Sequence, residues 1–132
     1  MKIGITFSTF DLLHAGHIAM LREAREQCDY LIAGLQVDPT IDRPEKNKPI
    51  QSLLERKIQI EAIKYVDEVI TYKKESDLEL LIKRVKPDIR ILGSDYIDKE
   101  YTGKDMDKEV YFHNRNHNWS TTELRERVKN VS

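Results

Sequence analysis

The chain has 132 residues, of which 39% are hydrophobic and 34% are charged. A chain of this length can bury one hydrophobic core without disulfides or metal ions, and this composition excludes an intrinsically disordered chain. We therefore expect a single domain over residues 1–132. The chain has 22 Lys and Arg residues and 23 Asp and Glu residues, which gives a formal net charge of −1. It therefore lacks the excess of positive charge that is typical of a nucleic-acid-binding protein.

Hydropathy and cysteine content bear on the compartment. No apolar stretch approaches the ~20 residues that a membrane-spanning helix needs, so we expect no membrane span. Cys28 is the only cysteine and cannot form an internal disulfide, and no basic and apolar leader precedes the first strand-like run. The sequence therefore predicts a protein of the reducing cytoplasm.

The apolar pattern predicts strands that alternate with helices. Short apolar runs predict strands over residues 2–7, 30–35, 66–72, 89–92 and 109–112. Apolar residues at helical spacing predict helices over residues 15–27 and 77–86, and capping boxes predict the starts of two more, over residues 52–65 and 120–129. Ser52 and Ser120, each followed three residues later by a glutamate, match capping boxes at two of these helix starts. The alternation predicts an α/β fold, a Rossmann-like doubly wound sheet of about five parallel strands with helices on both faces.

In such a sheet, ligands bind beyond the carboxyl ends of the strands. Most of the glycines, prolines and histidines lie in loops that follow predicted strands, namely residues 8–16, 36–51, 93–107 and 113–119. The second of these loops is too long for a simple connector, and long loops in small domains are usually functional. The sequence therefore predicts a ligand site formed by these loops.

Two histidines, His14 and His17, flank Gly16 at the start of the first predicted helix. Their spacing turns both rings the same way, and the glycine lets backbone approach a ligand closely. The helix N-terminus adds N–H groups and the positive end of a dipole, so the segment suits a phosphate group. Two other interpretations stay open at this point. The histidines are also suited to capping the helix without chemistry, or to a zinc site with His113 and His117, although neither pair encloses a Cys or a carboxylate.

Residues 9–17, Thr-Phe-Asp-Leu-Leu-His-Ala-Gly-His, resemble the signature of the (H/T)xGH nucleotidyltransferases. The likeness is to the cytidylyltransferase family, especially its glycerol-3-phosphate cytidylyltransferases, and it extends over nearly the whole chain. Further matching segments are residues 29–31, 55–57, 65–69 and 119–122. The resemblance implies in-line attack of an acceptor phosphate on the α-phosphorus of a nucleoside triphosphate, without a covalent enzyme intermediate. Such a reaction mainly requires aligned reactants and neutralised charge.

The resemblance also implies roles for individual residues. The implied catalytic residues are His14, His17, Lys46 and Arg115. The implied nucleotide-binding residues are Thr9, Phe10, Asp11, Gly16, Lys48, Gly93, Asp95, Ser120 and Thr121. Asp11 is expected to orient the first loop, and Arg43 is a further candidate beside the loop lysines. Solvated loop charge, turn residues and helix caps are the plainer interpretations of these side chains. No protein group is expected to hold a metal, because Mg²⁺ should arrive with the triphosphate.

These expectations lead to a specific reaction. The chain is expected to transfer CMP from CTP to glycerol 3-phosphate or a similar phosphorylated alcohol, releasing pyrophosphate. The alternatives are adenylyl transfer from ATP and a non-catalytic nucleotide-binding module. Ser8, where the family usually has glycine, and Lys64, where it usually has arginine, leave the substrate open. Small relatives of this kind imply a homodimer.

Overall fold

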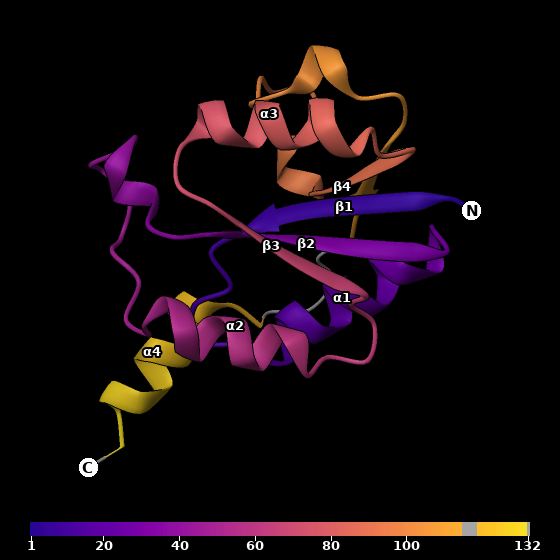
Figure 1. The fold of residues 1–132 in the computed structure, drawn as a ribbon. Helices are drawn as coiled ribbons and strands as arrows, with labels where there is room; N and C mark the ends of the chain where they lie inside the picture. The colour runs from indigo at the N-terminus through magenta and orange to yellow at the C-terminus, as the bar shows by residue number, and fades with distance from the viewer. Residues whose placement is uncertain (115–118, 132) are drawn as a thin grey trace.

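The computed structural model describes residues 1–114 and 119–131, which are organised around one five-stranded sheet (Figure 1). The strands are β1 (Ile3–Ser8), β2 (Tyr30–Gln36), β3 (Glu68–Tyr72), β4 (Ile89–Gly93) and β5 (Val110–His113). Their order is β3-β2-β1-β4-β5, and every pair of neighbours is parallel. The sheet confirms the predicted Rossmann-like α/β fold, in which the chain begins at the central strand and builds outward on both sides.

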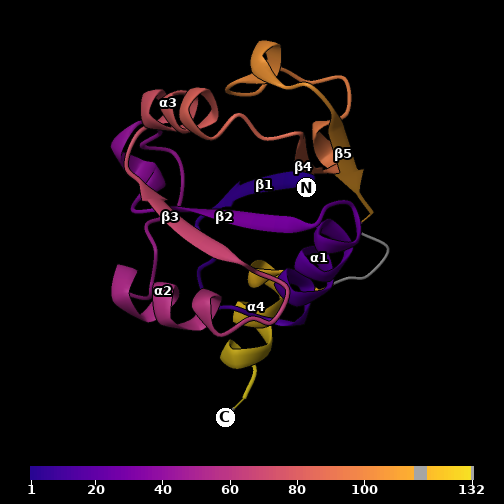
Figure 2. The ribbon, with the colours of Figure 1, turned by 45° about the vertical axis from the view of Figure 1, so that its right-hand side comes forward.

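Helices cover both faces of this sheet. The α-helices are α1 (Ala15–Glu26), α2 (Leu53–Glu61), α3 (Glu75–Val85) and α4 (Thr121–Lys129). Figures 1 and 2 show α1 and α2 on one face and α3 on the other, with α4 on the side of α1 and α2. Short 3-10 helices are η1 (Pro39–Ile41), η2 (Ser94–Tyr96) and η3 (Lys104–Met106). Among the described residues, no helix has both the length and the apolar character to cross a membrane.

The hydrophobic core has one part on each face. The larger part joins the buried faces of the central strands to Leu21 of α1 and Ile60 of α2, both fully buried. The smaller part lies under α3, where Leu78, Leu81 and Ile82 pack with Tyr72 at the end of β3. Burial of both sheet faces explains why the strands are near-continuous apolar runs in the sequence.

Helix α2 ends at Glu61, four residues before the predicted end at residue 65. The chain turns there, as the N–H groups of Ala62 and Ile63 donate to carbonyls three residues back, and the N–H of Val66 donates to the carbonyl of Ile63 in a further turn. The next residue, Asp67, accepts a 2.8 Å hydrogen bond from the N–H of Leu31 in β2. This side-chain contact fixes the entry to β3, which begins at Glu68 and not at the predicted residue 66.

Helix α3 begins at Glu75, two residues before the predicted start. The carboxylate of Asp77 accepts the N–H of Lys74 at 3.0 Å, so Asp77 lies inside the first turn and caps it from within. The helix ends where Lys86 takes a left-handed conformation with φ of 52°, directly before Pro87. Proline disfavours a helical residue before it, which explains this end.

Candidate active site

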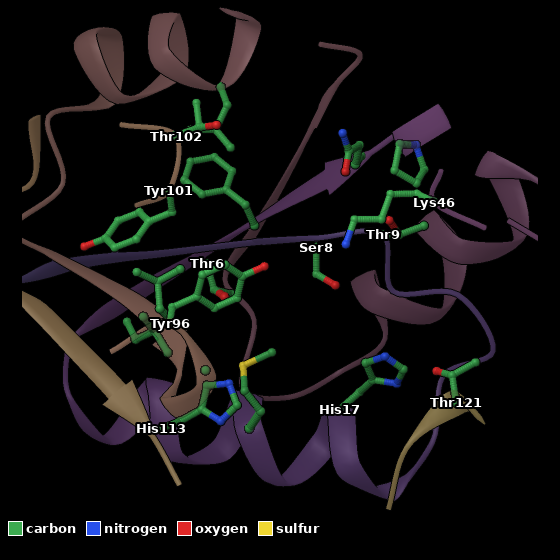
Figure 3. Close-up of a pocket in the computed structure, with 18 of the residues that line it drawn as sticks. Thr6, Ser8, Thr9, His17, Lys46, Tyr96, Tyr101, Thr102, His113 and Thr121 are labelled. Carbon is green, nitrogen blue, oxygen red and sulfur yellow. The ribbon is translucent and has the colours of Figure 1, made fainter. Parts of the chain in front are cut away.

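A cavity of about 650 Å³ lies at the carboxyl ends of the strands (Figure 3). The last residue of every strand lines it, and these residues are Ser8, Gln36, Tyr72, Gly93 and His113. The sequence predicted a ligand site at this edge, and this volume falls in the range of small-molecule sites. The remaining walls come from the starts of α1 and α4, the loop after β2, and the segment between β4 and β5.

His14 and His17 lie together at the start of α1, with ring centroids 4.0 Å apart. The Nδ1 atom of His14 accepts the N–H of Gly16 at 3.0 Å, and the Nδ1 atom of His17 accepts the N–H of His14 at 3.1 Å. A ring nitrogen that accepts carries no proton, so each neutral imidazole holds its proton on Nε2. The two histidines therefore cap the helix and, since both line the cavity, also offer donors to it.

Gly16 lies where the start of α1 packs against the segment before α4. A Cβ atom at this position would lie 2.8 Å from Cε1 of His14 and 2.9 Å from the carbonyl oxygen of Trp119. No side chain fits in that space, so the glycine allows the segment before α4 to pack on the start of α1. The Nε2 atom of His14 then lies 3.2 Å from the hydroxyl oxygen of Thr121.

The loop between β1 and α1 has an unusual backbone. Phe10 and Leu12 have φ values of 51° and 50°, in the left-handed region that non-glycine residues seldom adopt. Asp11 between them accepts the N–H groups of Ile50 and Gln51, each at 2.9 Å. Gln51 returns a bond, because its Oε1 atom accepts the N–H of Leu12 at 2.8 Å. These reciprocal bonds hold the strained loop against the segment before α2.

Arg56 of α2 joins the same loop to the end of β2. Its side chain is 2% exposed and donates to the carbonyls of Thr9, Gln36, Val37 and Gln51, at 2.7 to 3.2 Å. Burial lowers the pKa of Arg56, and the nearby carboxylates of Asp11 and Asp38 oppose that shift. The sequence showed Arg56 only as part of a matching segment, because four carbonyl partners from separate parts of the chain are not visible in a linear pattern.

The loop after β2 brings cationic groups to the cavity wall. Arg43 and Lys46 both line the cavity, and Arg43 forms an ion pair with Glu75 at the start of α3, at 2.7 Å. Asp38 fixes the beginning of the loop by accepting the N–H and the hydroxyl of Thr40, bonds that also lower the pKa of this carboxyl. Figure 3 shows Lys46 on the same side of the cavity as Thr9.

The opposite wall is built on a buried arginine in β4. Arg90 is 4% exposed, and its guanidinium lies 5.1 Å from the ring centroid of Phe7 and 4.9 Å from that of Tyr101. It also donates to the carbonyl of Thr102 and lies 3.6 Å from the carboxylate of Asp107. Burial lowers the pKa of Arg90 and raises that of Asp107, while the attraction between the two opposes both shifts. Arg90 therefore holds the segment between β4 and β5 over the sheet.

The structure places the expected site residues in three groups. The first group lines the cavity and comprises Thr9, His14, Gly16, His17, Lys46, Gly93, Ser120 and Thr121. The second group does not line it and comprises Phe10, Asp11, Lys48 and Asp95. Phe10 is 1% exposed and belongs to the core, and Asp11 orients the loop by bonding backbone. The third group, Arg115 with His117, lies outside the described residues.

Several cavity residues had no place in the sequence-based site. They are Gln36, Tyr72 and Arg90, all nine-tenths or more buried, while His113, which is equally buried, had entered only as a candidate zinc ligand. A charged residue inside the apolar run at 89–92 was the one signal that could have identified Arg90. Lys64, by contrast, lies 5.2 Å over the ring of Tyr65 and does not line the cavity.

The zinc interpretation gains no support from the described residues. Within residues 1–114 and 119–131, no group of three or more His, Cys, Asp and Glu side chains is placed to hold a metal ion. His14 and His17 instead use their Nδ1 atoms to accept backbone N–H groups.

Comparison with known proteins identifies the family of this chain. A sequence model of the cytidylyltransferase-like family matches residues 5–127. The bifunctional protein HldE of Helicobacter hepaticus is 42% identical over 110 residues, which are 83% of this chain and 23% of the relative. The HldE of Helicobacter pylori is 36% identical over 129 residues, 97% of this chain and 28% of the relative. The chain thus spans about a quarter of the length of these relatives.

Two solved structures share the fold. A lipopolysaccharide core biosynthesis protein from Thermoplasma volcanium has a TM-score of 0.70 at 28% identity, over 86% of this chain and 97% of that one. A pantoate-beta-alanine ligase from Francisella tularensis, complexed with beta-gamma ATP and beta-alanine, has a TM-score of 0.61 over 97% of this chain and 69% of that one. Its identity of 20% shows the fold alone. From the family match and the site geometry together, the chain belongs to the cytidylyltransferase-like family of the nucleotidyltransferase superfamily.

Proposed function

We propose that this nucleotidyltransferase transfers a nucleotidyl group from ATP to the phosphate of a small acceptor and releases pyrophosphate. The observation that carries the proposal is the convergence of His14, His17 and the start of α4 on one cavity. Two helix N-termini and two imidazole donors form a binding site suited to several phosphate groups.

The reaction needs no covalent intermediate. An oxygen of the acceptor phosphate attacks the α-phosphorus, a new phosphoanhydride bond forms, and the bond between the α- and β-phosphates breaks. Negative charge moves to the departing pyrophosphate, next to the Nε2–H groups of His14 and His17 and the N-terminus of α4. Donors fixed in advance by helix capping stabilise that charge without reorganising, and Lys46 adds a full positive charge.

Mg²⁺ belongs to the proposed substrate, as the metal–nucleotide complex. The phosphate oxygens of the nucleotide are hard ligands of the kind that Mg²⁺ prefers, and Asp11 already uses both oxygens on backbone N–H groups. The bound ion would lower the repulsion between the two phosphate groups that must meet.

ATP is preferred to CTP because of the relatives that the chain resembles. They include HldE proteins and a lipopolysaccharide core biosynthesis protein. The fold itself does not restrict the base to cytosine, since the Francisella ligase with this fold holds an ATP analogue. A lipopolysaccharide core is an oligosaccharide, and sugars are activated by linkage to a nucleotide, so we propose a sugar phosphate as the acceptor. CTP with glycerol 3-phosphate is the alternative within the same chemistry.

The test is pyrophosphate release by the purified protein with Mg²⁺, comparing ATP with CTP against glycerol 3-phosphate and a set of aldose 1-phosphates. We expect release with ATP and one sugar phosphate, reduced at least about 100-fold in His14→Ala and in His17→Ala. Nucleotide binding without release against the whole panel would favour the non-catalytic module. Release with CTP and glycerol 3-phosphate alone would favour the cytidylyl alternative.

Three further expectations stay proposals beside this function. They are the single-domain organisation, the homodimer and the cytoplasmic location. The thiol of Cys28 is buried and free, as a reducing compartment allows, and analytical ultracentrifugation of the purified chain would test the homodimer.

A further inference from the structure

Gln36, the last residue of β2, is a buried polar side chain at the wall of the cavity. It is 3% exposed, and its backbone is fixed because its carbonyl accepts a 2.7 Å hydrogen bond from Arg56. Its Nε2 atom has no hydrogen-bond partner within residues 1–114 and 119–131. In the sheet, Gln36 is paired with Tyr72 of β3, which also lines the cavity.

Without a ligand, an unpaired carboxamide at this position lowers the stability of the fold. Buried polar groups normally have a hydrogen-bond partner, and one without a partner destabilises the fold. An apolar side chain of the same length would avoid that cost, because Tyr72, its partner in the neighbouring strand, belongs to the hydrophobic core. A binding site that gains affinity at the expense of stability commonly shows this pattern.

The sheet order indicates which ligand Gln36 meets. The phosphate-binding groups His14 and His17 follow β1, and Gly93, the expected nucleoside contact, ends β4 on one side of it. Gln36 ends β2 on the other side of β1, where Arg43 and Lys46 of the following loop line the same cavity. A nucleotide lying from β1 toward β4 leaves this flank to the second substrate, whose phosphate needs cations near it.

We propose that the carboxamide of Gln36 hydrogen-bonds a hydroxyl group of the phosphorylated acceptor and so determines acceptor specificity. The inference rests on the proposed function, which makes the second substrate a small phosphorylated acceptor. A carboxamide offers both a donor and an acceptor, which matches a hydroxyl group that can do the same. A site built to bond a substrate hydroxyl rejects analogues that lack it, because its own polar group is then left without a partner.

The experiment replaces Gln36 by methionine, which has similar length and no strong hydrogen-bonding group. The matched control is Gln59→Met, since Gln59 of α2 also carries a buried amide oxygen without a partner among the described residues but does not line the cavity. We expect Gln36→Met to raise KM for the acceptor about tenfold, to leave KM for the nucleotide within about twofold, and to raise the thermal unfolding midpoint. Gln59→Met should leave both KM values as in the parent protein.

A rise in stability with a loss of acceptor affinity separates a binding role from a structural one. An unchanged acceptor KM, an equal rise in nucleotide KM, or a lower unfolding midpoint with both KM values raised would each overturn the inference. Gln36→Glu is the second variant if the methionine does not fold, and its carboxylate should weaken the binding of the acceptor phosphate further.

The proposed function and this inference can fail separately. If the parent protein releases no pyrophosphate, calorimetric titration with glycerol 3-phosphate and the aldose 1-phosphates tests Gln36 directly. Binding that is weakened in Gln36→Met and kept in Gln59→Met supports the inference even then. Absence of binding to the parent protein, or equal binding to both variants, contradicts it.

Discussion

The Nε2 atom of His14 lies 3.2 Å from the hydroxyl oxygen of Thr121, a residue 107 positions later in the chain. The contact joins the start of α1 to the start of α4, and Figure 3 shows Thr121 and His17 facing the same part of the cavity. The Nδ1 atom of His14 accepts the N–H of Gly16, so the ring is held from both of its nitrogens. The orientation of a proposed catalytic side chain therefore depends on how α4 is docked.

Removing the Thr121 hydroxyl should reduce turnover without unfolding the protein. In Thr121→Val the His14 ring loses one of its two fixed partners, and we expect kcat to fall about tenfold. Thr122→Val is the matched control, because Thr122 is exposed and does not line the cavity. Steady-state pyrophosphate release measures both. Equal rates in the two variants would show that the hydroxyl does not position His14.

Loss of the Arg125 side chain should loosen α4. This helix buries no residue fully, and Arg125 ties it to the β1–α1 loop through Asp11, at 3.6 Å. In Arg125→Ala we expect faster amide hydrogen exchange in α4 and a higher KM for the nucleotide, with little change in global stability. Arg127→Ala serves as the control, since that side chain is 65% exposed and pairs only along the helix with Glu123 in the described contacts. The idea fails if exchange in α4 is the same in both variants.

Replacing Arg56 should destabilise the whole fold. Arg56→Met leaves four buried or partly buried carbonyls without their shared donor, and we expect a loss of about 3 kcal/mol or more in the free energy of unfolding. Arg56→Lys should recover only part of this, because a lysine cannot reproduce the forked arrangement of donors. Urea denaturation followed by circular dichroism is the measurement, with Lys57→Met as the control. A loss no larger than that of the control would contradict the role given to Arg56.

The capping box of α2 should contribute to acid sensitivity. Hydrogen bonds from the backbone and hydroxyl groups of Ser52 hold the pKa of Glu55 below its ordinary value of 4.5. A lowered folded-state pKa gives stability that is present above the unfolded value and is lost as the pH falls through the folded value. Glu55→Gln should therefore lose less stability than the parent protein between about pH 5 and pH 3. Denaturant titrations across this range measure the difference, and Glu79→Gln, at an exposed position of α3, should behave like the parent.

The sequence by itself determined the elements and the central motif, because these depend on local interactions. Apolar patterns together with capping boxes predicted the five strands and the four α-helices of the described residues. The Ser52 capping box and the paired rings of His14 and His17 depend on residues three positions apart, so they were visible before any fold was known. Reading the alternation as a doubly wound sheet then located the ligand edge.

Only the tertiary structure decided which side chains meet at that edge. Parallel register places Gln36 of β2 beside Tyr72 of β3 and Arg90 of β4 beside Ile5 of β1. All three side chains that the sequence missed therefore owe their place at the cavity to register, which is a contact between distant segments. Other contacts between distant segments turned Asp11 toward the segment before α2 and fixed the entry to β3, where Asp67 accepts the N–H of Leu31. Local patterns carry the periodicity of a helix or strand, whereas the direction of a buried polar side chain depends on partners that only the folded chain brings near.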